Sequence, residues 1–178
     1  MRPIGVVPFG EVDGIVLKAI AAHILGYLQM DTEIAAPMEY PLYAYDRQRL
    51  QYDAGTILKD FESVSFNDYA KVIGILDADL FVPILTYVFG EARQGGTCAL
   101  VSLYRLKRNP DGAEAALPVF FERAAKVALH ELGHLFNLIH CENESCLMHF
   151  SGGLPDLDKA PPYFCRYCSV FLRDGLTL

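Results

Sequence analysis

The chain has 178 residues, 52% of them hydrophobic and 21% charged, and a formal net charge of -7 at pH 7. This length fits one domain with a buried core, and the acidic balance without a basic stripe argues against nucleic acid or a membrane surface as a partner. The N-terminus does not resemble a secretory signal, and the most apolar stretch, 14–28, is too short to span a bilayer, so a cytoplasmic protein is expected.

The first half of the chain alternates predicted strands with predicted helices. Strands are expected at 4–7, 32–36 and 71–76. Asp13 is a plausible N-cap for a helix that extends to Leu28. Asp46 is expected to cap a second helix, whose core-facing positions would be Leu50, Ala54, Ile57, Leu58 and Phe61.

The second half begins with a predicted strand at 97–104 and a polar loop at 105–118, followed by a helix at 119–136. The stretch after Met148 has loop-like composition, and a last helix is expected from about Pro162 to Gly175. Strands and helices early, then helices and loops late, indicate an α/β (α+β) fold with a mixed upper part and an irregular lower part. A substrate cleft is expected between the two parts.

The predicted helix at 119–136 contains the sequence HELGH, residues 130–134. His130 and His134 lie one helical turn apart, so both imidazoles can reach one metal ion. Glu131 is close enough to contact a water on that ion without occupying its coordination sphere. Zinc lowers the pKa of bound water, and a neighbouring carboxylate can take the proton and return it to a leaving amine. The alternative is a helix with two unconnected histidines.

A third histidine strengthens the metal hypothesis. His140 lies six residues beyond His134, so the helix must end between them for His140 to turn back. Asn137 is the expected breaking point, because asparagine tolerates the left-handed conformation that ends many helices. Three nitrogen ligands leave one position open for water, which is typical of catalytic zinc.

Four of the five cysteines form two pairs, Cys141 with Cys146 and Cys165 with Cys168. Two pairs of thiolates suit a closed tetrahedral zinc site that would pin the last helix to the segment after the histidines. Two disulfides are the alternative, which a reducing compartment disfavours. Because His140 and Cys141 are adjacent, their side chains can serve two different ions.

These motifs together resemble the archaemetzincins, a family of metzincin zinc metallopeptidases. The resemblance rests on HELGHLFNLIHC at 130–141, on Cys146-Leu147-Met148, and on Cys165-Arg166-Tyr167-Cys168. The segment DADLFVPILTYVFGEA, residues 77–92, also looks like the family. Asn137 departs from the family pattern, which has glycine at that position.

The resemblance implies a role for each motif residue. His130, His134 and His140 would bind the catalytic zinc, Glu131 would be the general base and acid, and Met148 would be the Met-turn methionine beneath the histidines. Cys141, Cys146, Cys165 and Cys168 would hold a second, structural zinc. The implied fold is a compact zincin domain over 1–178, with an upper subdomain at about 1–137, a lower one at about 138–178, and a cleft lined by an edge strand within 97–104.

The leading functional hypothesis is a monomeric, zinc-dependent peptidase that acts on peptides or small proteins. Whether it cuts inside chains or trims their ends cannot be read from the metal ligands. One alternative is a non-catalytic protein that uses the same site to bind peptides, and another is a purely structural zinc module. Glu131 favours catalysis, because a structural role gives no reason for a carboxylate beside the first ligand.

Overall fold

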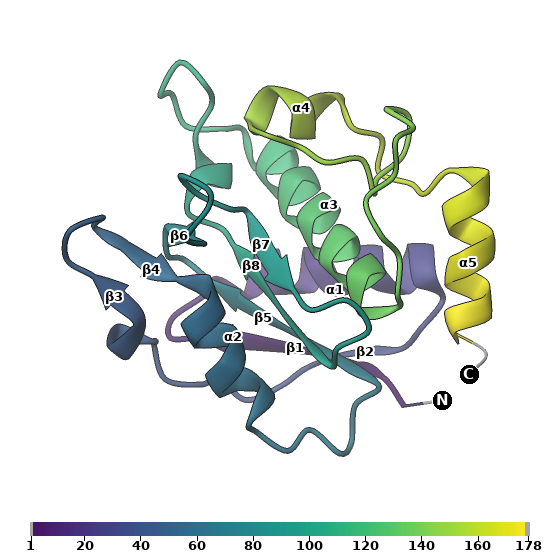
Figure 1. Ribbon diagram of the computed structural model, residues 1–178, viewed down its shortest axis with the longest axis horizontal. Helices are drawn as coiled ribbons and strands as arrows, with labels where there is room; N and C mark the ends of the chain where they lie inside the picture. The colour runs from purple at the N-terminus through teal and green to yellow at the C-terminus, as the bar shows by residue number, and fades with distance from the viewer. Residues whose placement is uncertain (1, 177–178) are drawn as a thin grey trace.

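The computed structural model describes residues 2–176, which form a mixed α/β fold (Figure 1). Its main sheet has five strands in the order β2 (Thr32–Ile34), β1 (Ile4–Phe9), β5 (Lys71–Leu76), β8 (Cys98–Ser102) and β7 (Gly90–Ala92). The first four are mutually parallel, and β7 pairs antiparallel with β8. A smaller sheet contains β3 (Tyr45–Asp46), β4 (Gln51–Asp53) and β6 (Leu80–Phe81).

Helices cover both faces of the main sheet, which explains why its central strands are apolar at successive positions. Helices α1 (Gly14–Leu28) and α3 (Leu117–Leu135) pack with alternate strand residues such as Ile73 and Ile75 on one face. The intervening residues face the other side, where α2 (Ala54–Glu62) contributes Ile57 and Phe61 to a second core. The α3 helix therefore lies against a sheet that has helices packed on both faces.

The second helix begins later than the sequence pattern predicts. Its N-cap is Asp53, whose carboxylate accepts a hydrogen bond from the Thr56 amide at 3.1 Å. Asp46 instead accepts from the amides of Gln48 and Arg49, which closes the turn between β3 and β4. Aspartate stabilises such turns as readily as helix starts, so the sequence pattern alone does not distinguish Asp46 from Asp53 as the N-cap. Leu50, expected in the core, is 70% exposed in that turn with φ 56°.

The expected edge strand is also corrected by the structure. The strand predicted at 97–104 is β8, which lies inside the sheet between β5 and β7. The edge is β7, a three-residue strand with no clear alternation of apolar and polar residues. Cys98 accordingly does not border the cleft, because its side chain is buried in the core on the α2 face.

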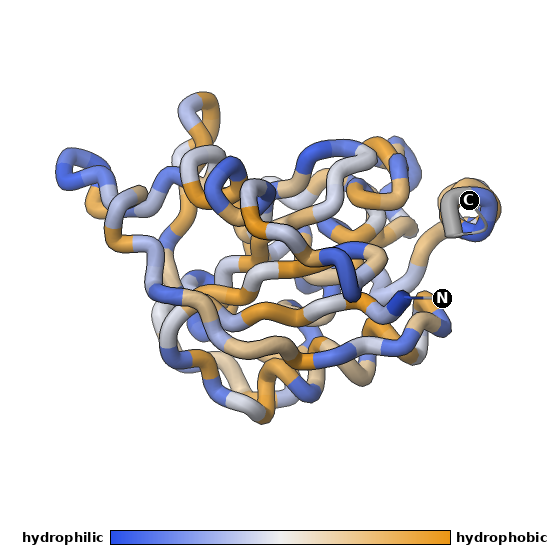
Figure 2. The backbone as a smooth tube through the Cα atoms, turned by 90° about the horizontal axis from the view of Figure 1, so that it is seen from below, coloured by the Kyte–Doolittle hydropathy of each residue, from blue (hydrophilic) through white to orange (hydrophobic). Residues whose placement is uncertain are grey.

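The C-terminal part contains one helix that composition did not indicate. Residues predicted as loop include α4 (Leu154–Lys159), and the last helix, α5, spans Arg166–Leu176 rather than starting near Pro162. In Figures 1 and 2, α5 lies at the periphery of the molecule. No helix within residues 2–176 is long and apolar enough to cross a membrane. The boundary predicted near residue 137 stays a prediction.

Candidate active site

Helix α3 carries the first two histidines and the glutamate into the molecule. Pro118 lies in its first turn, where the absent amide hydrogen costs nothing. The helix packs against β7 and β8, and Glu131 is only 7% exposed. His130 and His134 are half-buried on one face of the helix, as their spacing predicts.

The end of α3 directs the chain back toward these side chains. Asn137 has φ 68°, the left-handed conformation predicted for the residue that ends the helix. The Leu138 amide donates to the Gly133 carbonyl at 2.9 Å, and the Asn137 amide donates to the His134 carbonyl at 3.0 Å. These bonds close the helix end and allow His140 to approach the other two histidines.

The three histidines converge on one point. One ligand nitrogen from each of His130, His134 and His140 lies within 4.8 Å of the others. The Nε2 atoms of His130 and His134 are 3.1 Å apart. Two nitrogens on one tetrahedral zinc would be separated by about 3.3 Å, given zinc–nitrogen bonds of about 2.0 Å. The donor set therefore fits a zinc ion.

Backbone carbonyls orient two of the imidazole rings. Nδ1 of His130 donates to the Leu147 carbonyl, and Nδ1 of His134 donates to the Leu138 carbonyl, both at 2.8 Å. Each bond places the ring proton on Nδ1 and leaves the lone pair of Nε2 free, which is the tautomer that a metal ligand needs. Burial lowers the pKa of His130 to about 3 and also lowers the pKa values of His134 and His140, so the rings are neutral near pH 7.

Glu131 lies beside the histidines in an acidic environment. Burial raises its pKa well above the usual value, and the negative charge of Glu91 on β7 raises it further. Burial also raises the pKa of Glu91. Gly90 is needed here, because a Cβ at that position would come within 2.6 Å of the Glu131 carboxylate. The edge strand and the glutamate are thus in close contact.

Met148 packs beneath the histidine-bearing helix. It is fully buried, and a Cβ added to Gly133 would lie 2.5 Å from its Sδ atom. Glycine at position 133 therefore allows the Met148 segment to approach α3 between the two helical histidines. The Leu147 carbonyl that orients His130 belongs to the same segment.

A cavity of about 470 Å³ opens at this point between the edge strand and the lower part. Its wall includes all three histidines and Glu131, residues 85–92 from the upper part, and residues 147, 150–152, 157 and 160 from the lower part. The cleft predicted between the two parts is present, although β7 rather than β8 borders it.

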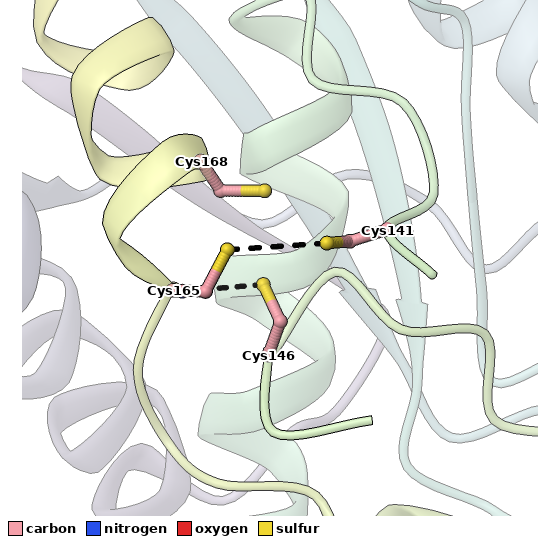
Figure 3. A group of neighbouring side chains, drawn as sticks. All are labelled: Cys141, Cys146, Cys165 and Cys168. Carbon is pink, nitrogen blue, oxygen red and sulfur yellow. Dashed lines mark hydrogen bonds between the residues drawn. The ribbon is translucent and has the colours of Figure 1, made fainter. Parts of the chain in front are cut away.

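The four paired cysteines form a second cluster, drawn in Figure 3. Their sulfur atoms lie within 4.8 Å of one another, and the Cys141 and Cys165 sulfurs are 3.9 Å apart. That separation is too long for a disulfide between these two residues, and all five cysteines, which lie within the described residues, are free. Two sulfurs on one tetrahedral zinc would be about 3.8 Å apart, so this cluster also fits a zinc ion.

The two clusters are joined by adjacent residues. The Cys141 amide donates to the Met148 carbonyl at 2.8 Å, and His149 Nδ1 donates to the Cys141 carbonyl at 2.9 Å. His140 therefore belongs to the histidine cluster and Cys141 to the cysteine cluster, as the adjacent positions suggested.

Comparison with known proteins decides the family. The model of peptidase family M54 matches residues 28–174. The chain belongs to this family. A curated archaemetzincin of Methanocaldococcus jannaschii is 36% identical over 167 residues, which cover 94% of this chain and 90% of that protein. An archaemetzincin of Pyrococcus furiosus is 36% identical, and the match covers 96% of this chain and 92% of that protein.

Solved structures agree with the family assignment. The crystal structure of archaemetzincin from Methanopyrus kandleri has a TM-score of 0.87 at 32% identity, with 99% of this chain and 96% of that chain covered. The crystal structure of a zinc-dependent peptidase from Methanocorpusculum labreanum has a TM-score of 0.84 at 28% identity. The match covers 95% of this chain and 99% of that chain. This M54 member is thus a zinc metallopeptidase with the zincin-like mixed α/β fold.

Other sequence features of this M54 chain have structural roles. His23 bonds the carbonyl of Ala19, one turn earlier in α1, and does not join the metal cluster. Asp77 and Asp79 form ion pairs with Lys107 and Arg105. Sequence reasoning missed Glu91 and Tyr87, two cavity-lining residues, because no spacing rule links them to the histidine motif.

Proposed function

We propose that this M54 peptidase hydrolyses peptide bonds with Glu131 as its general base and acid. The observation that carries the proposal is the convergence of three histidines beside a buried carboxylate in one cavity. Zinc, when bound by His130, His134 and His140, would supply a Lewis acid that polarises a carbonyl and makes water nucleophilic near neutral pH. Three imidazoles also bind other divalent ions, so the assignment of zinc rests on the ligand type and on the family.

The protein side chains have separate tasks in this proposal. Glu131 takes a proton from the attacking water and returns it to the nitrogen of the leaving amine. The backbone bonds of His130 and His134 hold their rings in place, and Met148 supports α3 from below. The Glu131 carboxylate lines the same cavity as the three histidines. The charge of a cation bound there would lower the pKa of Glu131 and so favour the deprotonated form that a general base needs.

The edge strand is suited to hold an extended substrate. The β7 strand pairs with β8 on one side only, so its other side has backbone groups available toward the cavity. An extended peptide can add to such an edge through main-chain hydrogen bonds. We infer that residues 90–92, and not a strand within 97–104, bind the substrate backbone beside Glu131.

The cysteine cluster is proposed to hold a second, structural zinc ion, giving two ions per chain. Four thiolates leave no open coordination position, so this ion would link α5 to the segment after His140. We further propose that the substrate is a peptide or small protein, that the protein is a monomer, and that it is located in the cytoplasm.

The first test is cleavage of a mixed-length peptide library by the zinc-loaded protein, analysed by mass spectrometry. New peptide termini are expected with the wild type and not with Glu131→Gln. The positions of the cuts then distinguish internal cleavage from end-trimming.

Metal analysis of both proteins is the control. Two zinc ions per chain are expected in each, with one lost after joint replacement of His130 and His134. If both metal sites are filled and neither protein cuts, catalysis is rejected and a non-catalytic peptide-binding protein becomes the better description.

A further inference from the structure

Tyr87 crosses the cleft at one end. It lies three residues before β7, and its hydroxyl donates to the Gly152 carbonyl of the lower part at 3.4 Å. A Cβ at Gly153 would be 3.3 Å from the same hydroxyl oxygen. The side chain thus connects the upper wall of the cavity to the lower one at this end.

A polar network fixes the position of the Tyr87 ring. The Arg105 guanidinium lies 4.0 Å above the ring centroid and forms two bonds to Asp79, at 2.6 and 2.7 Å. Gln51 donates both to Asp79 and to the carbonyl of Thr86, the residue before Tyr87. The ring also packs against Phe89 in an edge-to-face arrangement, with centroids 5.5 Å apart. These contacts hold the side chain against free rotation.

A second cavity, of about 790 Å³, lies beyond this ring. Tyr87 and Phe89 line both cavities, so they form the partition between them. The far side is lined by residues that include Tyr104, Arg105 and Phe120.

From this geometry we propose that Tyr87 determines substrate specificity by ending the cleft and limiting substrate length on its side of the cut bond. The proposal rests on the peptide-binding role of the cleft. Gly90 faces Glu131, and Tyr87 lies three residues away, which is at most about 10 Å along the chain because the backbone bends at Phe89. At most about three substrate residues therefore fit between the reaction centre and Tyr87.

The test measures peptide binding, so that it does not depend on turnover. In the zinc-loaded Glu131→Gln protein, fluorescence anisotropy would follow peptides that share one core and are extended one residue at a time at either end. We expect affinity to fall about tenfold when the extension at one end exceeds about three residues. Adding Tyr87→Ala should remove this loss, because the longer peptide can enter the second cavity.

Two further variants serve as controls. Tyr87→Phe keeps the ring over Arg105 and should retain the length limit. Tyr104→Ala removes an aromatic ring that lines only the second cavity, and it should leave the limit unchanged.

The proposal is overturned if extension at neither end weakens binding, if Tyr87→Ala leaves the length profile unchanged, or if no peptide binds. A length limit without any cleavage by the wild type would reject catalysis and still support the role of Tyr87.

Discussion

Asn137 shows how one residue places the third histidine. It adopts φ 68°, and its own carbonyl accepts a bond from the Gln94 side chain at 3.2 Å. Alanine in this conformation costs about 1–2 kcal/mol, whereas asparagine and glycine tolerate it. We expect Asn137→Ala to lower the free energy of unfolding by about 1 kcal/mol and Asn137→Gly to change it by less than about 0.5 kcal/mol. Chemical denaturation of both variants measures the difference, and equal losses would contradict a backbone origin.

Gly133 has a different constraint, the close approach of Met148. An alanine Cβ would lie 2.5 Å from the Met148 Sδ atom, so either the methionine or the helix must move. Overpacking of this kind costs about 1–3 kcal/mol. We expect Gly133→Ala to lower the thermal midpoint and to weaken zinc retention at the histidines. Gly26→Ala is the matched control, because its position in α1 is open and the helix propensity of alanine should make it neutral or stabilising.

Site residues whose positions follow from short spacings along the chain could be predicted from the sequence. The three histidines converge, the four cysteines converge, and Asn137 has the expected conformation. Tyr87 and Glu91 could not be predicted, because their position depends on how the edge strand crosses the cleft. Tyr87 and Gly152, for example, are 65 positions apart in the sequence, and a contact over that distance produces no local sequence pattern.

At the scale of elements, α3 and α4 are joined by a partly buried ion pair. Arg123, with only 3% of its side chain exposed, forms two bonds of 2.7 Å to Asp158, whose side chain is 38% exposed. The Arg123 guanidinium lowers the pKa of Asp158. The pair therefore stabilises the fold above the ordinary aspartate pKa of about 3.9, and this contribution is lost as the pH falls through the lower folded-state value.

We expect Asp158→Asn to reduce the free energy of unfolding at pH 7 by about 1–2 kcal/mol, a value reduced for the exposure of Asp158. The difference from the wild type should shrink as the pH falls below about 4. Denaturant unfolding across a pH series measures this. A difference that persists at low pH would mean that packing, and not charge, is responsible.

Helices and strands could be predicted where a regular pattern of apolar residues extends over most of the element. The strands at β1 and β5 and the helices α1 and α3 match their patterns to within a few residues. Three short features were not predicted correctly: β7, with three residues, α4, with six, and the start of α2, for which two aspartates were possible N-caps. Tertiary packing rather than local preference determines such short segments.

For the whole molecule, the cysteine cluster is expected to stabilise the C-terminal part. Helix α5 places Leu172 and Cys168 in the core, while Tyr167 and Phe171 are exposed. With so small a buried face, α5 should depend on metal binding at the cysteines. Replacing Cys146 with serine should increase hydrogen exchange in α5 and the segment at 141–148, with little change in the central strands. Unchanged exchange in α5 would show that packing alone holds it.

The adjacency of His140 and Cys141 has a thermodynamic consequence. An ion held by the cysteines would restrain residue 141, and this restraint would remove part of the entropy that residue 140 loses when it binds an ion. With an ion in each cluster, the two affinities would be linked, and the factor by which each ion strengthens the other would be the same in both directions. A chelator that strips the cysteines would thus also weaken metal binding at the histidines, although it never touches them.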